Sequence, residues 1–122
     1  MTLPIFDLAT ATAALFRDGA SDVTTASGPP RRIDGLVVGM PILTRNPPHN
    51  GEMHPDGDEL LYLVSGSVEV WYEDGDTEHS FPLRPGEACI VPKGIWHKVR
   101  LLETPSQLLH VTPGPGGEHR PL

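Results

Sequence analysis

The strongest indication of the fold is the stretch GEACIVPKGIWH, which runs from Gly86 to His97. It contains a short apolar run, a Pro92-x-Gly94 turn and a second apolar run that begins at Ile95. Short apolar runs bounded by Pro and Gly predict β-strands joined by tight turns. This turn therefore places the imidazole of His97 on a strand.

Further strands are predicted on both sides of this stretch. Apolar residues alternate from Leu36 to Ile42, and turn residues such as Asp74-Gly75 separate the later runs. Strands are predicted over 36–42, 60–64, 67–72, 88–91, 95–102 and 107–112. Short strands with a turn every 8–12 residues are typical of a β-sandwich or a small β-barrel.

A second informative stretch, HNGEMHPDGDE, runs from His49 to Glu59 and offers six possible metal ligands in eleven positions. Glu52 and His54 are two residues apart, so on a strand they point to the same face. Glu59 begins the apolar run Leu60 to Val64, where a carboxylate is costly to bury unless it is paired or bound to a cation. Asp56 and Asp58 are interpreted as turn residues, because Asp bonds its own backbone in such loops.

Together the two stretches resemble the cupin family. The second has the spacing Gly86, five residues, Pro92-x-Gly94-x-x-His97, and the first has His54, four residues, Glu59, six residues, Gly66. The resemblance covers residues 31–112 and implies an antiparallel jelly-roll β-barrel. It further implies that His54, Glu59 and His97 bind a divalent metal inside the barrel. Two positions depart from the family's pattern, where Glu52 replaces the usual first histidine and Leu101 an asparagine.

A site formed by Glu52, His54, Glu59 and His97 combines two imidazoles with two carboxylates. Such a ligand set suits Fe, Mn, Zn or Ni better than copper(I) or calcium. An octahedral metal bound there leaves positions open for substrate or dioxygen. The alternative is a metal-free cluster that mutual hydrogen bonds hold together.

Other residues are predicted to surround this site. Glu52 is the candidate general base, because it occupies the atypical position. By strand parity, the apolar wall of a substrate pocket would consist of Leu61, Leu63, Ile95 and Val99. His49 and His110 are further candidates for contact with a substrate, although an exposed or hydrogen-bonded strand histidine is the simpler interpretation of each.

Both ends of the chain lie outside the predicted barrel, so residues 1–30 and 113–122 are assigned to separate segments. Ile5, Leu8, Ala11 and Leu15 fall at helical spacing, with Asp7 before them as a possible cap and Gly19 after them as a stop. A short N-terminal helix is therefore predicted over Ile5–Arg17, followed by a linker over 20–30. The rest, residues 113–122, is rich in Pro and Gly and predicts an extended tail.

Composition excludes several classes of partner. A chain of 122 residues with a formal charge of −7 lacks the basic surface that nucleic-acid binding needs. No apolar stretch approaches the roughly 20 residues that span a bilayer, and the N-terminus does not read as a signal peptide, so no membrane contact and a cytoplasmic location are expected. Trp96 and Tyr62 are predicted to face outward, which favours a homodimer.

These observations give two main hypotheses about function, besides a largely structural barrel with a vestigial site. The first is a metal-dependent cupin enzyme, of the dioxygenase, isomerase or lyase type, acting on a small polar or carboxylated molecule. The alternative is a non-catalytic, metal-free module that binds or senses a small molecule. Metal content distinguishes the two.

Overall fold

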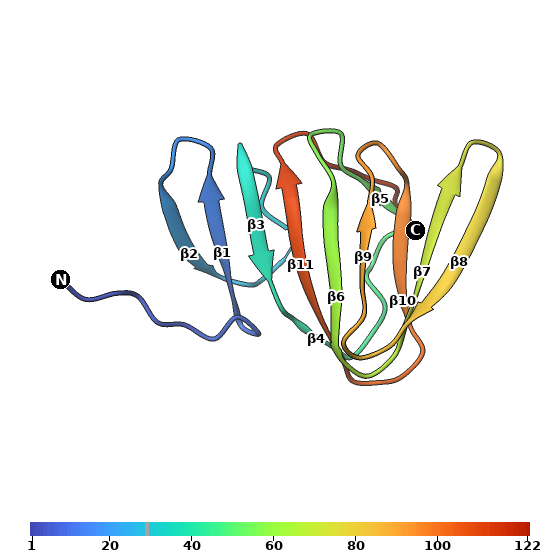
Figure 1. The fold of residues 1–122 in the computed structure, drawn as a ribbon, viewed down its shortest axis with the longest axis horizontal. Helices are drawn as coiled ribbons and strands as arrows, with labels where there is room; N and C mark the ends of the chain where they lie inside the picture. The colour runs from blue at the N-terminus through green and yellow to red at the C-terminus, as the bar shows by residue number, and fades with distance from the viewer. Residues whose placement is uncertain (29) are drawn as a thin grey trace.

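The computed structural model describes residues 1–28 and 30–122, and every regular element in this part of the chain is a β-strand. The strands form two antiparallel sheets (Figure 1). The first has the order β2-β1-β3-β11-β6-β9, with β4 paired to β11. Its strands are β1 (Ala11–Phe16), β2 (Ser21–Thr25), β3 (Gly35–Gly39), β4 (Ile42–Leu43), β6 (Glu59–Ser65), β9 (Ala88–Val91) and β11 (Ser106–Gly114).

The second sheet has the order β12-β5-β10-β7-β8. Its strands are β5 (Glu52–Met53), β7 (Val68–Asp74), β8 (Thr77–Leu83), β10 (His97–Leu101) and β12 (Glu118–His119). The predicted all-β, antiparallel class is confirmed, but the prediction of a closed barrel is wrong. Each sheet keeps two edge strands, β2 and β9 in the first and β12 and β8 in the second, so the fold is a jelly roll of two packed sheets rather than a closed barrel.

One hydrophobic core joins the two sheets. Strands β6, β9 and β11 of the first sheet and β7 and β8 of the second contribute to it. Its buried members are Leu61, Leu63, Val68, Val70, Leu83, Val91 and Leu108. Because strand residues alternate between faces, the same strands direct their other side chains away from this core.

The prediction of an N-terminal helix is wrong, because residues 11–16 form strand β1. This strand pairs with β2 on one side and β3 on the other. Asp7 accepts hydrogen bonds from the backbone N–H groups of Ala9, Thr10 and Ala11, which makes a turn before β1. Gly19, with φ of 95°, sits in the turn between β1 and β2. Pairing on both edges of β1 outweighs the weak helical spacing.

The segment predicted as a linker also contains a strand, since β2 covers Ser21–Thr25. Position 29, within that predicted linker, lies outside the described residues. At the other end of the chain, Pro113 and Gly114 complete β11, and β12 pairs with β5. The C-terminal residues thus take part in both sheets.

Gly66, the last residue of the first motif, is required by its surroundings. Its φ is +86°, and a Cβ added there would lie 2.7 Å from the Cα of Ser106. We expect Gly66→Ala to destabilise the protein by more than the roughly 1–2 kcal/mol of a left-handed residue alone. Gly75→Ala is the matched control, because Gly75 has φ of +62° and open space around it. Urea denaturation of both variants checks this, and equal losses would contradict it.

Candidate metal centre

Three strands and one loop position the predicted ligands. Glu52 is in β5, Glu59 is the first residue of β6, and His97 is the first residue of β10. Glu52 and His97 are directly opposed across the β5–β10 ladder. His54 follows β5, and its carbonyl accepts a hydrogen bond from the N–H of Gly94. The Pro92-x-Gly94 turn is thereby attached to the loop that carries His54.

Asp58 ties the same two loops together. Its Oδ1 accepts a hydrogen bond of 2.9 Å from the N–H of Lys93. Asp56 instead accepts from the N–H of Gly116. Both carboxylates thus accept hydrogen bonds from backbone N–H groups of neighbouring loops. This agrees with their interpretation as loop residues rather than metal ligands.

The four candidate ligands converge on one region. Each offers one ligand atom, and these atoms all lie within 4.8 Å of one another. The Nε2 atom of His97 is 2.8 Å from Oε1 of Glu59 and 3.6 Å from Oε1 of Glu52. The Nε2 atom of His54 is 3.4 Å from Oε2 of Glu59 and 3.8 Å from Oε1 of Glu52. A shared cation position is therefore sterically available to this group of residues, hereafter the His/Glu cluster.

Burial and hydrogen bonding fit a bound cation. His97 is 1% exposed, Glu59 2% and His54 9%. The carbonyl oxygen of Ile95 can only accept, so Nδ1 of His97 donates to it at 3.0 Å and leaves Nε2 facing the carboxylates. Both ring nitrogens of His54 are buried without a hydrogen-bond partner. Buried polar atoms are normally satisfied, and a metal ion would supply the missing partner of Nε2, the nitrogen that lies 3.4 Å from Oε2 of Glu59.

The ionisation of the cluster follows from these contacts. Burial acts to raise the pKa of Glu59, but the nearby imidazoles of His54 and His97 lower it to about 2. Burial acts to lower the pKa of both histidines, but the two carboxylates raise it to about 9 for His54 and about 10 for His97. The pKa of Glu52 lies well below its usual range, because the attraction of the two neighbouring histidines outweighs its burial. Without metal, two imidazoliums therefore balance two carboxylates at neutral pH.

This charge balance predicts how the stability of the metal-free protein depends on pH. His54 and His97 contribute fully to the folding stability below their ordinary pKa of 6.5. This contribution is lost as the pH rises towards their pKa values in the folded protein, about 9 and about 10. The Glu59 contribution is complete above 4.5 and is lost as pH falls towards 2. We expect stability in chelator, measured by urea denaturation, to be greatest between pH 4.5 and 6.5. A His54→Gln variant should lose less than the parent between pH 6.5 and 9, and equal losses would refute this assignment.

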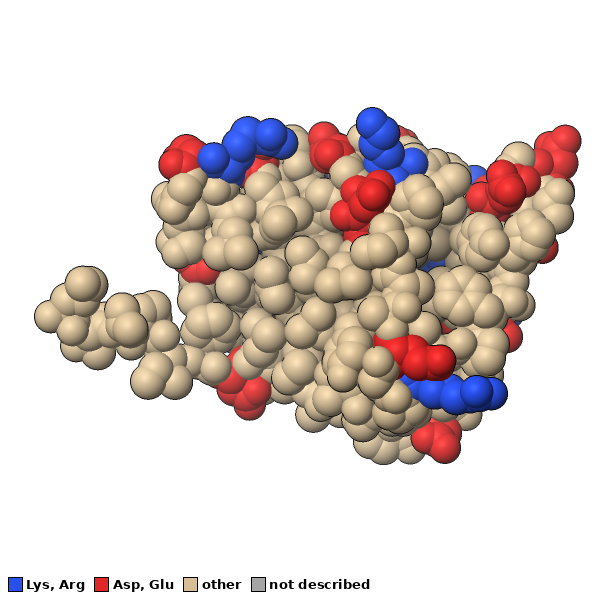
Figure 2. Space-filling view, viewed as in Figure 1, with Lys and Arg blue, Asp and Glu red and all other residues tan. Residues whose placement is uncertain are grey.

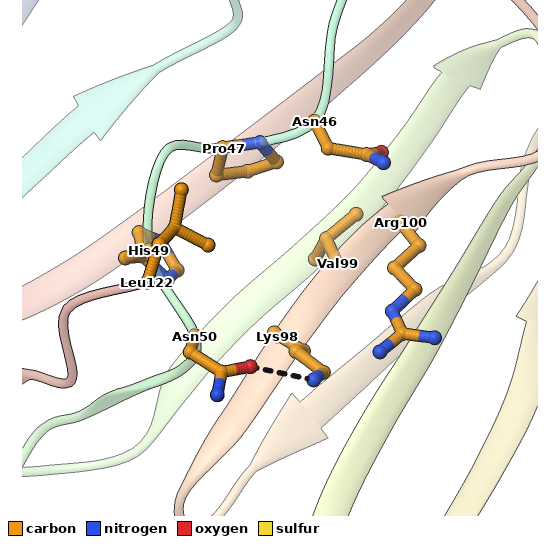
Figure 3. Close-up of a pocket in the computed structure, with 8 residues that line it drawn as sticks. All are labelled: Asn46, Pro47, His49, Asn50, Lys98, Val99, Arg100 and Leu122. Atoms are coloured by element: carbon orange, nitrogen blue, oxygen red, sulfur yellow. Dashed lines mark hydrogen bonds between the residues drawn. The ribbon is translucent and has the colours of Figure 1, made fainter.

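The residues predicted to contact a substrate lie either in the hydrophobic core or at a surface cavity, and Val99 adjoins both. Leu61 and Leu63 are buried in the core, and Ile95 and Val99 are half-buried against it. His49 and Val99 also line a small surface cavity of about 140 Å³, together with Asn46, Pro47, Asn50, Lys98, Arg100 and Leu122 (Figure 3). Nε2 of His49 lies 3.8 Å from Oε2 of Glu52, so one side chain separates this cavity from the His/Glu cluster.

Sequence reasoning missed one residue at the cluster, Thr112. Its hydroxyl donates a hydrogen bond of 2.6 Å to Oε2 of Glu59. His110, which was considered as a pocket residue, bonds the same hydroxyl at 2.7 Å through Nδ1. The two residues are two apart in β11, and this spacing was the available signal that they share a face.

The fold and the cluster together define an all-β protein with a buried His/Glu group at one end of two sheets. The family model for the cupin domain matches residues 44–112, which is more than half of the chain. The chain therefore belongs to the cupin family. Over 62 residues it is 37% identical to germin-like protein 9-3 of Oryza sativa subsp. japonica. The matched stretch covers 50% of this chain and 28% of that protein.

Solved structures of low sequence identity share the fold. Oxalate decarboxylase from Bacillus subtilis has a TM-score of 0.58 at 19% identity, over 69% of this chain and 23% of that one. Hydroxypropylphosphonic acid epoxidase from S. wedmorenis has a TM-score of 0.53 at 18% identity, over 65% and 44%. The oxalate decarboxylase has Mn(II) centres. Two further solved structures with the same fold are of an enzyme called HppE, one with Co(II) and one with Fe(II). The chain spans less than half the length of each of these relatives.

Over positions 1–28 and 30–122, the chain has no helix with the length and apolar character needed to cross a bilayer.

Proposed function

We propose that this cupin binds one divalent metal through Glu52, His54, Glu59 and His97 and acts on a small polar or carboxylated molecule. The observation that carries the proposal is His54, whose Nε2 is buried and unpartnered beside three other ligand atoms. Two imidazoles and two carboxylates suit Fe, Mn, Zn or Ni. A bound metal of this kind supplies Lewis-acid polarisation of a substrate oxygen, or a place for dioxygen.

The cluster residues would have different roles in binding the metal and in accepting a proton. Glu59 and His97 are almost fully buried, so they hold their positions within the cluster. The Glu52 side chain is 28% exposed, which makes it the cluster member best placed to meet a substrate and accept its proton. We therefore propose that Glu52 alternates between metal ligand and general base.

The size and charge of the neighbouring cavity support a small, acidic substrate. Its volume of about 140 Å³ leaves room only for a small molecule. Lys98 and Arg100 line it, so it offers positive charge to a carboxylate. His49 lies between this cavity and Glu52, and its imidazole would contact a molecule that extends from one to the other.

The direct test is a calorimetric titration of chelator-treated protein with Mn(II), Fe(II), Zn(II) and Ni(II). We expect one ion per chain and release of about two protons at pH 7, because both histidines must lose a proton to coordinate. Small carboxylic acids and sugars are then titrated into loaded and metal-free protein. Acids that bind only the loaded form support the proposal, and equal binding to both forms argues against a metal-centred substrate site.

A metal-free binding or sensing module is the second candidate. The 2.8 Å contact between His97 and Glu59 favours it, because these two side chains satisfy each other without a cation. A protein of this type would bind the same small acids with chelator present. The titration above distinguishes the two functions.

We also propose a homodimer, formed through the outer face of the first sheet. Its ladders align one apolar row across six strands, namely Val23, Ala13, Val38, Val111, Leu60 and Ile90. Ile90 is 57% exposed and Val23 38%, and Figure 2 shows a broad uncharged surface over β1, β3, β11 and β6. Trp96 does not contribute, because the guanidinium of Arg120 covers its ring at 4.0 Å.

Light scattering at micromolar concentration checks the dimer. We expect twice the chain mass of 13.2 kDa, and a shift to the monomer mass when Ile90 is replaced by Asp. Leu102→Asp is the control, since Leu102 is equally exposed but lies outside the row. A monomeric parent protein would contradict the proposal.

A further inference from the structure

We infer that His110 and Thr112 are positioning residues, which orient Glu59 for the metal through a chain of two hydrogen bonds. The inference rests on the proposed metal function and extends it to residues that are not ligands. It starts from the Oε2 atom of Glu59, which accepts the Thr112 hydroxyl at 2.6 Å. The other oxygen, Oε1, lies towards His97.

The direction of each hydrogen bond follows from donor chemistry. An ionised carboxylate only accepts, so the single hydroxyl hydrogen of Thr112 points to Glu59. The Thr112 oxygen must then accept from His110, whose Nδ1 lies 2.7 Å away and therefore carries a hydrogen. His110 thus prevents the hydroxyl from turning away from Glu59. Burial lowers the pKa of His110, which agrees with a neutral ring that has one N–H.

The His110 ring is confined on its other side by β3. His110 and Gly39 are directly opposed in the β3–β11 ladder. A Cβ added to Gly39 would lie 2.5 Å from Nε2 of His110. The ring therefore occupies space that only a glycine leaves free, and its Nδ1 stays aimed at Thr112.

Oriented outer partners matter because they fix how a ligand presents its oxygen atoms. With Oε2 engaged by Thr112, Glu59 presents Oε1 to the centre of the cluster. Loss of such a partner typically lowers metal affinity by about 10–100-fold. This role differs from contact with a substrate, because it acts on the metal affinity alone.

The test measures Zn(II) affinity by calorimetry and unfolding of the metal-free protein by urea. We expect Thr112→Val, which removes the hydroxyl but keeps the shape, to weaken Zn(II) binding by about 10–100-fold. Thr112→Ser should restore most of the affinity. Thr24→Val is the control, since Thr24 is a half-buried strand threonine remote from the cluster, bonded to Thr12.

A double-mutant cycle tests whether His110 acts through Thr112. We expect His110→Leu alone to weaken Zn(II) binding several-fold, but to add little in the Thr112→Val background. Additive effects would overturn the relay. Unchanged affinity in Thr112→Val would overturn the inference while leaving the metal site intact. If Thr112→Val does not fold, the Zn(II) affinities of His110→Leu and Thr112→Ser are compared instead. Weaker binding in His110→Leu than in Thr112→Ser supports the relay, and equal affinities overturn it. A parent protein that binds none of Mn(II), Fe(II), Zn(II) and Ni(II) would refute the proposed function itself.

Discussion

Replacement of His97 by alanine should lower the affinity for Zn(II) by at least about 100-fold, more than the loss of an outer partner. The reason is geometric, because His97 is the one histidine whose Nε2 lies within 3.6 Å of both Glu52 and Glu59. Its Nδ1 bond to Ile95 leaves only Nε2 for a ligand. Calorimetric titration of the chelator-treated variant measures the effect.

His79→Ala is the matched control for this variant. His79 is an exposed strand histidine that stacks on Tyr72, with ring centroids 5.1 Å apart. It should keep the parent affinity. A His97→Ala protein with full metal content would remove His97 from the role assigned to it.

Replacement of Glu59 by alanine should destabilise the metal-free protein by about 3–5 kcal/mol, the usual cost of removing one partner from a buried ion pair. Glu59 is 2% exposed and contacts both histidines, so the variant leaves buried imidazoliums without their nearest counter-charge. Urea denaturation at pH 6 in chelator measures the loss. Both histidines are charged in the parent at this pH.

The control for Glu59 is Glu78, which is exposed in β8 and opposes Glu73. Its replacement by alanine should change stability by no more than about 0.5 kcal/mol. Equal effects at the two positions would show that the buried cluster does not contribute as described. A large effect at Glu59 alone supports the ion-pair arrangement.

The sequence predicted the central strands because their signals are local. The runs around Leu60–Val64 and Ala88–Val91 are bounded by Gly and Pro, and the structure has β6 and β9 there. The glycine that ends the first cupin motif also has a local cause, since only glycine readily adopts the φ of +86° at position 66. Such features can be recognised from neighbouring residues alone.

The N-terminal region was mispredicted because its structure depends on distant residues. Ala13 pairs with Val23 on one side and with Val38 on the other. Neither partner can be inferred from the alanine-rich spacing of residues 5–17, which favours a helix when considered alone. The pairing of β12 with β5 depends in the same way on contacts across the whole chain.

The ligand residues could be proposed from spacing, but their surroundings could not. The opposition of Glu52 and His97 depends on strand register, and the contact of Thr112 with Glu59 joins residues 53 positions apart. The ionisation of the cluster depends on burial, which a list of residues does not contain. The structure supplied all three.

The most direct test of the central claim is the metal content of the protein, purified without added metal and measured by elemental analysis against protein concentration. The account predicts close to one transition-metal ion per chain in the parent protein. It also predicts that His97→Ala and Glu59→Ala lose this ion, while His79→Ala and Glu78→Ala retain it. A parent protein that contains no metal, and binds none when Mn(II), Fe(II), Zn(II) or Ni(II) is supplied, would contradict the account.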